Sequence, residues 1–325
     1  MKAVLFEKYG PPEVLRVAEV VRPVPLADEL LVRIVAAGVN RSDCGTRGTS
    51  PFFVRIFTGI LRPRRPFTGR EFSGVVEECG AQVTEFELGD EVFGIAIGGR
   101  GGTHAEYVCI KESAPIAKKP SNVNFEEAAG ACDGAILAKK FMERGGVAAG
   151  TRLLVYGASG SVGTAAVQIA KSLGAHVTAV CGSAAMETVR SLGPDQIINY
   201  QQENFWDRPE TYDVILDAWG QLSFLKSRTA LTATGIFIAT DLGARYINPL
   251  LILFTMRSRR RIVLPIPGYK KADVEWLKQL MEDGAFRPVI SRRFALGEIA
   301  AAVSHVDAGQ KLGNIVLTIS AANSI

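Results

Sequence analysis

The sequence predicts an α/β protein in which a mostly β first part precedes a doubly wound parallel sheet. Up to about residue 122, short strand-like runs alternate with glycine-rich turns, which is typical of a small β-barrel. From about residue 123, strand-like and helix-like patterns alternate, which predicts a parallel sheet covered by helices. This alternation stops after residue 264, so residues 265–325 are expected to return to the first domain.

The strands of the first part are predicted from short apolar or alternating runs that glycines bound. They cover residues 30–36, 74–78, 91–97 and 105–110. The strands of the second part are apolar runs of the kind found in buried parallel sheets. They cover residues 152–156, 176–180, 196–199, 213–217, 235–240 and 261–264, and helices at 272–283 and 296–308 and a strand at 314–319 follow.

The most informative motif joins the strand at 152–156 to the next helix. Gly157, Gly160 and Gly163 are spaced three residues apart, and apolar side chains then recur at helical spacing up to Leu173. In such a strand–turn–helix unit, N–H groups at the helix start face an anion, and the glycines let the backbone approach a pyrophosphate closely. An ordinary tight turn is the alternative interpretation.

The residues after the second strand of this sheet bear on the choice between NAD and NADP. NAD sites usually carry an acidic residue about 20 positions past the first glycine, where it binds the ribose 2′-hydroxyl. Here the first acid is Glu187, inside the predicted helix, and Ser183 could donate a hydrogen bond to a 2′-phosphate. No basic residue stands at the strand end, because Arg190 lies one turn further on. We therefore predict NADP, with NAD as the alternative.

Composition and charge narrow the class of protein. Hydrophobic residues make up 47% and charged residues 22%, as in ordinary globular proteins, and the net charge of +4 does not by itself indicate nucleic acid or an anionic membrane. The first apolar run is too short for a signal peptide, and no run of about 18 apolar residues occurs. The five cysteines form no C-x-x-C pair, so a reducing, cytoplasmic location is expected.

Several motifs follow one another in a characteristic order along nearly the whole chain. They lie at residues 38–43, 69–76, 83–94, 157–163, 198–200 and 313–317. Together they resemble a medium-chain dehydrogenase/reductase of the zinc-independent quinone oxidoreductase type. The resemblance implies a GroES-like β-barrel catalytic domain (1–122), a Rossmann nucleotide-binding domain (123–264), a return to the catalytic domain (265–325), and a homodimer paired through the strand at 261–264.

The same resemblance implies a cofactor site. The pyrophosphate of the cofactor would lie on Gly157, Ser159, Gly160, Ser161, Val162 and Gly163. The adenosine end would lie beside Ser183 and Tyr200, and the nicotinamide beside Asp241, Leu242, Gly313 and Asn314. Two positions depart from the family pattern. Many NADP-using relatives carry Arg or Lys where this chain has Ala184, and Lys is common where it has Asn314.

Zinc-dependent relatives carry Cys, His and Cys where this chain aligns Asn40, Arg70 and Cys132. One thiol cannot hold a catalytic zinc, which needs about three protein ligands, so no metal is expected. Without a Lewis acid, the favoured acceptors are quinones and α,β-unsaturated carbonyls, which delocalise the developing charge themselves. The Asn40 amide is expected to stabilise the remaining charge on oxygen, the alternative being a turn residue that bonds its own backbone.

Other candidate residues have weaker signals. Asp43 is a second candidate catalytic residue, although its position favours a helix cap. His104 lies in a glycine-rich loop and is the histidine with a candidate function. Segments 51–67 and 250–261 mix apolar and basic residues. We expect them to pack within the protein or at an interface, and the alternative is that they contact an anionic membrane.

The predicted function is an NADPH-preferring reductase of quinones or α,β-unsaturated carbonyls, whose partners are small molecules rather than nucleic acid. Two alternatives share the same cofactor site. One is a zinc-independent alcohol or aldehyde oxidoreductase, and the other is a protein that binds NADPH as a sensor or partner without turnover.

Overall fold

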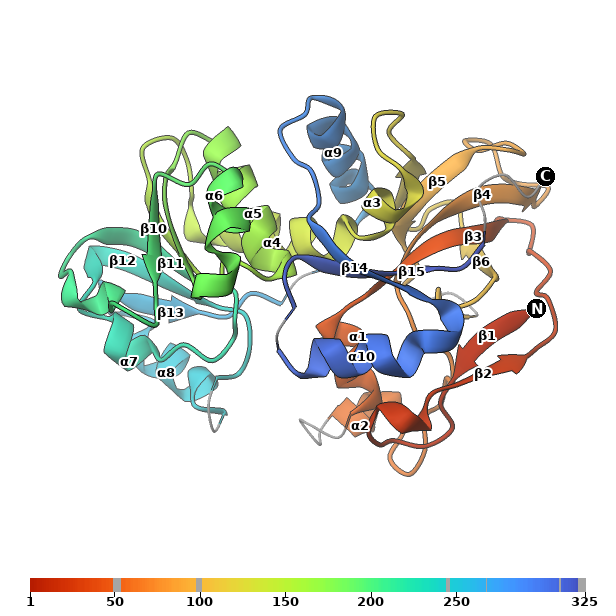
Figure 1. Ribbon diagram of the computed structural model, residues 1–325, viewed down its shortest axis with the longest axis horizontal. Coiled ribbons are helices and arrows are strands. Elements are labelled where there is room, and N and C mark those ends of the chain that lie inside the picture. The colour runs from red at the N-terminus through yellow and green to blue at the C-terminus, as the bar shows by residue number, and fades with distance from the viewer. Residues whose placement is uncertain (49–53, 98–100, 244–245, 267, 310, 321–325) are drawn as a thin grey trace. The chain divides into compact units, whose positions relative to one another are not determined.

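The computed structural model describes residues 1–48, 54–97, 101–243, 246–266, 268–309 and 311–320 (Figure 1). The chain forms two compact units. Unit 1 consists of Met1–Asp133 and Tyr269–Ile325, and unit 2 of Gly134–Gly268. Helix α4 (Cys132–Gly145) crosses the first boundary, which lies further along the chain than the change of pattern near residue 123.

Unit 1 contains a mixed sheet whose strands follow the order β14-β15-β3-β4-β5-β7, with β6 also paired to β3. Because β15 pairs antiparallel with β3, segments from the two ends of the chain share one sheet. A separate two-stranded sheet joins β1 and β2. The strands are β1 (Lys2–Leu5), β2 (Arg16–Glu19), β3 (Glu29–Val39), β4 (Glu71–Cys79), β5 (Glu91–Ile95), β6 (Tyr107–Lys111), β7 (Ile116–Lys118), β14 (Ile290–Ala295) and β15 (Asn314–Thr318).

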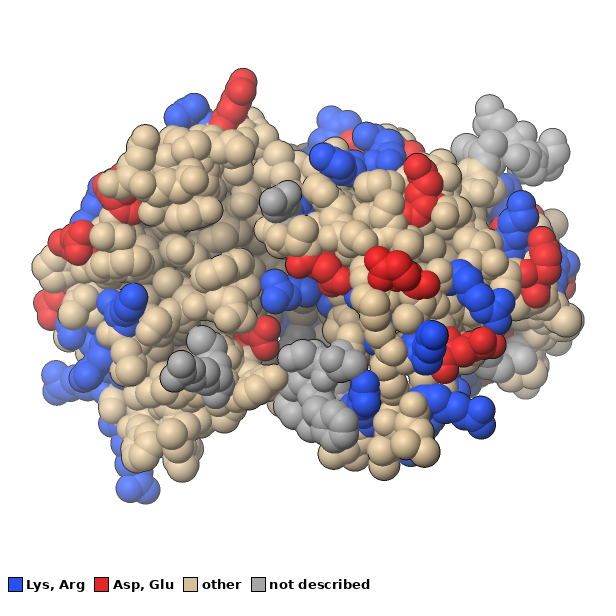
Figure 2. Space-filling model, turned by 60° about the horizontal axis from the view of Figure 1, so that its bottom comes forward, with Lys and Arg blue, Asp and Glu red and all other residues tan. Residues whose placement is uncertain are grey.

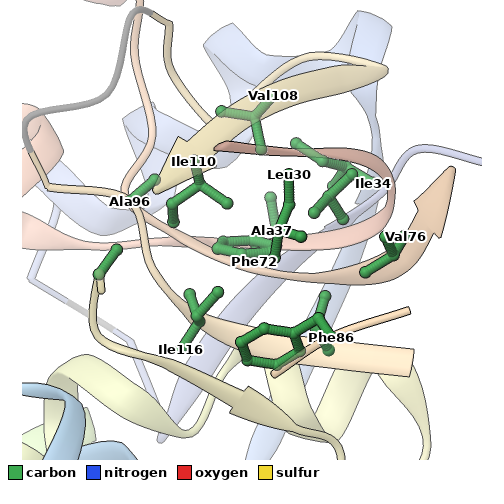
Figure 3. Close-up of a cluster of buried hydrophobic side chains, with 13 residues drawn as sticks. Leu30, Ile34, Ala37, Phe72, Val76, Phe86, Ala96, Val108, Ile110 and Ile116 are labelled. Carbon is green, nitrogen blue, oxygen red and sulfur yellow. The ribbon is translucent and has the colours of Figure 1, made fainter. Parts of the chain in front are cut away.

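The core of unit 1 forms where this sheet encloses its apolar side chains (Figure 3). Alternate residues of β3, Leu30, Val32 and Ile34, enter one core cluster, as the two-residue period of a strand requires. Phe72 of β4 and Ile110 of β6 pack in the same cluster. Each fully buried apolar side chain of this size stabilises the fold by about 1.5–3 kcal/mol.

Unit 2 is a parallel sheet in the order β10-β9-β8-β11-β12-β13. Counted along the chain from β8, this is the order 3-2-1-4-5-6, so the doubly wound fold is confirmed. The order reverses between β8 and β11, and ligands bind such sheets at the carboxyl ends of the strands beside this reversal. The strands are β8 (Arg152–Tyr156), β9 (His176–Cys181), β10 (Gln196–Asn199), β11 (Tyr212–Asp217), β12 (Leu231–Ala239) and β13 (Arg261–Val263).

Helices complete both units. Unit 1 has α1 (Arg41–Arg47), α2 (Val54–Thr58), α3 (Phe125–Ala129), α9 (Lys271–Glu282) and α10 (Ile299–Asp307); unit 2 has α5 (Ser161–Ser172), α6 (Met186–Ser191), α7 (Phe224–Ser227) and α8 (Asn248–Thr255). Among the described helices, none has the length and apolar character needed to cross a membrane.

Helix α8 occupies much of the apolar-basic segment 250–261. Its outer side chains and those just after it are exposed, among them Leu250, Leu253, Phe254 and Met256. An exposed apolar patch of this kind is typical of a surface that contacts a partner. A homodimer through β13 and membrane contact through this segment both stay predictions. Part of the other segment, residues 51–53, lies outside the described residues.

Candidate functional site

The predicted pyrophosphate site lies in unit 2, between β8 and α5. Gly157 follows β8 with a φ of 77°, a conformation that favours glycine. At Gly163, a Cβ would collide with the carbonyl oxygen of Gly157 and lie 2.7 Å from the Cα of Ala158. Because those atoms belong to the backbone, the first turn of α5 can pack against the glycine turn only if residue 163 has no side chain.

Two further observations show that this turn fits a pyrophosphate. Gly160 is the N-cap of α5, so no side chain accepts hydrogen bonds from the N–H groups of the first helical turn. Ser161 Oγ is buried and has no hydrogen-bond partner among the described residues. Free donors at a helix N-terminus, together with the helix dipole, form a site for an anionic phosphate. Ser159 and Val162 lie in the same turn and helix start.

Aromatic side chains surround the carboxyl ends of the neighbouring strands. Tyr156 ends β8, and its ring centroid lies 6.4 Å from that of Tyr200, after β10, and 6.1 Å from that of Trp219, after β11. Tyr200 and Trp219 are both about half exposed. They therefore present flat apolar surfaces beside the glycine turn. Sequence reasoning identified only Tyr200, although all three residues lie where ligands of such sheets bind.

Ser183 begins the turn after β9, where the ribose 2′ position was predicted. Its hydroxyl donates a hydrogen bond to Gln201 Oε1 (2.8 Å) and accepts one from Asn199 Nδ2 (2.8 Å). Burial raises the pKa of Cys181 at the end of β9, and the Arg190 guanidinium opposes that rise. The positive charge of Arg190 therefore acts at the strand end, although this residue lies further along the chain.

A buried carboxylate fixes the loop after β11. Asp217 accepts hydrogen bonds from the backbone N–H groups of Trp219, Gly220 and Leu222 at 3.2, 2.8 and 2.9 Å. Burial raises its pKa to about 6. Sequence reasoning missed this residue, whose signal is an acid at the end of an apolar strand.

Asp241 and Leu242, predicted beside the nicotinamide, follow β12. The Asp241 carboxylate accepts a hydrogen bond from the Leu242 backbone N–H (2.7 Å), and its carbonyl oxygen accepts one from Asn248 Nδ2 (2.9 Å). The second of these bonds ties the loop to the start of α8.

A second group of candidate residues gathers in unit 1 around Glu71, the first residue of β4. Asn40 Nδ2 donates a hydrogen bond to Glu71 Oε2, and the Asp133 backbone N–H donates one to Glu71 Oε1. Burial raises the pKa of Glu71 to about 8, and the neighbouring Asp133 carboxylate adds to this rise. Glu71 therefore holds a proton more readily than an ordinary glutamate.

Lys311 brings a positive charge to the same group. Its Nζ donates a hydrogen bond to Asn40 Oδ1 at 3.2 Å. The residue is partly exposed, but its ammonium lies deep enough for burial to lower its pKa, an effect that Glu71 and Asp133 oppose. The Asn40 amide is consequently held at its oxygen by a cation and at its nitrogen by a carboxyl group.

Asp133 connects this group to Tyr269. Tyr269 Oη donates a hydrogen bond to Asp133 Oδ1, and Ser42 Oγ lies 3.5 Å from Asp133 Oδ2. Burial raises the pKa of Asp133, while the hydrogen bond from Tyr269 and the charge of Arg70 lower it. Burial and the Asp133 carboxylate raise the pKa of Tyr269, so the phenol stays protonated.

Asn40, Arg70 and Cys132, which align with zinc ligands of relatives, do not fit a catalytic zinc. The Asn40 amide is engaged by Glu71 and Lys311, and a guanidinium is a cation with no free lone pair. Burial and the Glu71 carboxylate raise the pKa of Cys132, whereas zinc binds the thiolate. Within the described ranges, no three His, Cys, Asp or Glu side chains are grouped so as to hold a metal ion.

Asp43 lies at the start of α1. Its Oδ2 accepts a hydrogen bond from the Asn40 backbone N–H at 2.9 Å, as a helix-capping acid does. Asn40 is the N-cap residue of α1, and its side chain in addition bonds Glu71 and Lys311.

Gly313 and Asn314 lie in unit 1, where the chain enters β15. Gly313 has a φ of 60°, and a Cβ there would lie 2.7 Å from Val289 Cβ. Asn314 is buried and donates from its backbone N–H to the Val289 carbonyl oxygen at 2.7 Å. Its Oδ1 has no partner among the described residues. A lysine, Lys311, lies three residues before Asn314 in the chain.

Unit 1 also contains a pocket of about 550 Å³. It is lined by Phe6, Asp43, Thr58, Pro63, Arg64, Arg65, Phe67, Thr68, Gly69, Arg70, Ala96 and Ile97. His104 is buried behind this wall, where its Nδ1 lies 2.9 Å from Thr68 Oγ1 and its Nε2 2.9 Å from the Gly38 carbonyl oxygen. These contacts give His104 a structural role.

Comparisons with known proteins agree with this fold. Residues 26–121 match the alcohol dehydrogenase GroES-like domain, and residues 192–317 match the zinc-binding dehydrogenase domain. The 2-methylene-furan-3-one reductase of Solanum lycopersicum is 30% identical, over 98% of this chain and 79% of that protein. The NADPH-dependent alkenal/one oxidoreductase of Arabidopsis thaliana is 29% identical over the same shares.

Among solved structures, the quinone oxidoreductase of Coxiella burnetii superposes with a TM-score of 0.88 at 28% identity, covering 98% of this chain and 99% of that one. The likeness thus extends over both units. The chain belongs to the medium-chain dehydrogenase/reductase family, among its quinone oxidoreductase-like members.

Proposed function

We propose that this chain reduces quinones or α,β-unsaturated carbonyls with NADPH and without a catalytic metal. The observation that carries the proposal is the Asn40 amide, held between Lys311 and Glu71. Glu71 is the acceptor found for its NH₂ group among the described residues, which leaves one N–H for a substrate oxygen. Names of relatives support the same acceptors, because they include an alkenal/one oxidoreductase and a quinone oxidoreductase.

The residues of unit 1 would act on the acceptor as follows. NADPH, when bound, supplies the hydride. Asn40 donates its free N–H to the carbonyl oxygen of the acceptor, where negative charge develops, and Lys311 strengthens this donor by polarising the amide. Burial raises the pKa of Glu71 and of Asp133, so these carboxyl groups bind a proton more readily than exposed ones do. Quinones and enones suit such a site because they spread the charge that a metal would otherwise stabilise.

Although one matched domain is described as a zinc-binding dehydrogenase, the donor set at Asn40, Arg70 and Cys132 supports a metal-free reaction. The test is NADPH oxidation by chelator-treated protein with 2-cyclohexenone and with 9,10-phenanthrenequinone. We expect both acceptors to be reduced at the same rate before and after chelation. The proposal is overturned if chelation abolishes turnover and zinc restores it, or if the protein turns over alcohols alone. Tight NADPH binding without any turnover would instead favour a sensor.

NADPH rather than NADH is proposed because Ser183 follows the end of β9, the charge of Arg190 in α6 acts on Cys181 there, and no acidic residue stands between Cys181 and Glu187. Replacing Arg190 by Ala should raise the KM for NADPH about tenfold, since a charge-assisted hydrogen bond contributes about 1.5–3 kcal/mol, and should leave the KM for NADH unchanged. Steady-state kinetics with both nucleotides measure this, and Arg228→Ala, another exposed arginine of unit 2, is the control. Equal changes for both nucleotides would contradict the assignment.

A further inference from the structure

The pocket of unit 1 has the size of a small-molecule site. Its volume of about 550 Å³ falls within the range of about 300–1,000 Å³ that such sites occupy. Phe6, Phe67, Ala96 and Ile97 give it an apolar lining, as most ligand sites have. The volume is larger than a single carbonyl group needs, so further parts of an acceptor would fit there.

The polar lining of this pocket is mainly basic. It contains three arginines, Arg64, Arg65 and Arg70, and one acid, Asp43. On the face drawn in Figure 2, by contrast, basic and acidic side chains are interspersed. Arg64 is exposed, and no ion pair of its side chain is found among the described residues. Its guanidinium can therefore bind an anion through two parallel hydrogen bonds.

The basic lining lies close to the residues proposed to bind the acceptor carbonyl. Asp43 lines the pocket and accepts the hydrogen bond from the Asn40 backbone. Arg70 lines it too, precedes Glu71 in the chain, and acts electrostatically on Asp133 and Tyr269. Asp43 and Arg70 thus connect the pocket lining to Asn40 and to the carboxyl groups around it. Within this lining, Asp43 would repel an anion, whereas Arg64 would attract one.

The wall that carries Arg70 is held in place by packing. Gly69 has a φ of 88°, and a Cβ there would lie 2.5 Å from His104 Cδ2 and 2.6 Å from the His104 backbone nitrogen. His104 is fixed in turn by its contacts with Thr68 and the Gly38 carbonyl oxygen. This part of the pocket wall is consequently rigid, which reduces the entropy lost when a ligand binds against it.

We propose that the acceptor carries a carboxylate in addition to its conjugated carbonyl, and that Arg64, with Arg70, binds this carboxylate in the pocket of unit 1. The inference rests on the proposed function, because it assigns the class of substrate for the same site. It explains why basic side chains line an otherwise apolar pocket beside a site for a neutral carbonyl.

The test compares (E)-6-oxohept-4-enoate with its methyl ester. Both compounds contain the same enone, but only the acid carries a negative charge, on a carboxylate that two methylene groups separate from the enone. The wild-type protein should reduce the acid with a kcat/KM at least tenfold above that of the ester, and added salt should diminish this preference. Arg64→Gln should lower kcat/KM for the acid about tenfold and leave the ester unchanged. Arg62→Gln, an exposed arginine outside the pocket lining, should change neither.

The outcomes separate the two proposals. If the ester is reduced as well as the acid, or if Arg64→Gln lowers both alike, the carboxylate site is wrong while the reductase assignment stands. If neither compound nor any simple enone or quinone is reduced with NADPH, the reductase assignment fails, and the carboxylate site fails with it.

Discussion

Replacing Lys311 by methionine should lower kcat for enone reduction about 100-fold, which is the size of effect seen when a preorganised donor to an oxyanion is disturbed. Methionine preserves much of the length and packing of lysine but removes the cation that holds the Asn40 oxygen at 3.2 Å. The Asn40 amide is then free to turn, and Glu71 and Asp133 lose a positive charge that favours their ionised forms. The affinity for NADPH should stay nearly unchanged, because Lys311 is not among the predicted cofactor contacts, of which only Gly313 and Asn314 lie near it in the chain.

A conservative replacement separates orientation from folding. Lys311→Arg keeps a positive charge and should recover at least tenfold of the lost kcat, whereas a purely structural defect would not respond to charge in this way. Steady-state kinetics give kcat and KM for both variants, and NADPH titration by fluorescence checks that the cofactor still binds. A Lys311→Met protein that binds NADPH and keeps wild-type kcat would exclude the proposed role of Lys311.

The second large effect is expected at the glycine turn. Gly163→Ala places a methyl group against the Gly157 carbonyl oxygen and 2.7 Å from the Ala158 Cα, and neither atom can move without shifting the backbone. Overpacking of this kind costs about 1–3 kcal/mol, and it opens the turn whose N–H groups would face the pyrophosphate. We expect the Kd for NADPH to rise at least tenfold and the melting temperature to fall.

A second glycine provides the matched control. Gly297→Ala introduces the same methyl group where no atom lies within 4 Å and the backbone has no positive φ. It should leave the Kd and the melting temperature nearly unchanged. If Gly163→Ala bound NADPH as tightly as the wild-type protein, the close approach at residue 163 would not matter for the cofactor.

The parallel sheet could be predicted from the sequence because its strands are buried on both faces. Strands β8 and β10 begin and end at the predicted residues, and the others differ by a few positions at their ends. Strands β2 and β14 could not be predicted, because several of their side chains are exposed. Arg16 and Glu19 of β2, like Arg292 and Arg293 of β14, are exposed, so these segments lack the apolar run that signals a strand. They form because a neighbouring strand offers hydrogen bonds.

In the candidate site, too, some features could be predicted from the sequence and others could not. The glycine turn could be predicted because its residues are contiguous and each has a local conformational reason. Asn40 was identified from its place in a motif, but its partner Lys311 lies 271 residues away in the chain, and Tyr269 lies 136 residues from Asp133. No local pattern marks such pairs, since the fold alone brings them together.

The division of unit 1 between the two ends of the chain has a consequence for biosynthesis. A ribosome completes all of unit 2, Gly134–Gly268, before it begins the second part of unit 1. Unit 2 can therefore fold during translation, as domains generally do, while the sheet of unit 1 waits for β15 to pair with β3. Lys311 enters just before that last strand, so a prematurely terminated chain can contain the whole glycine turn and still lack the cation beside Asn40.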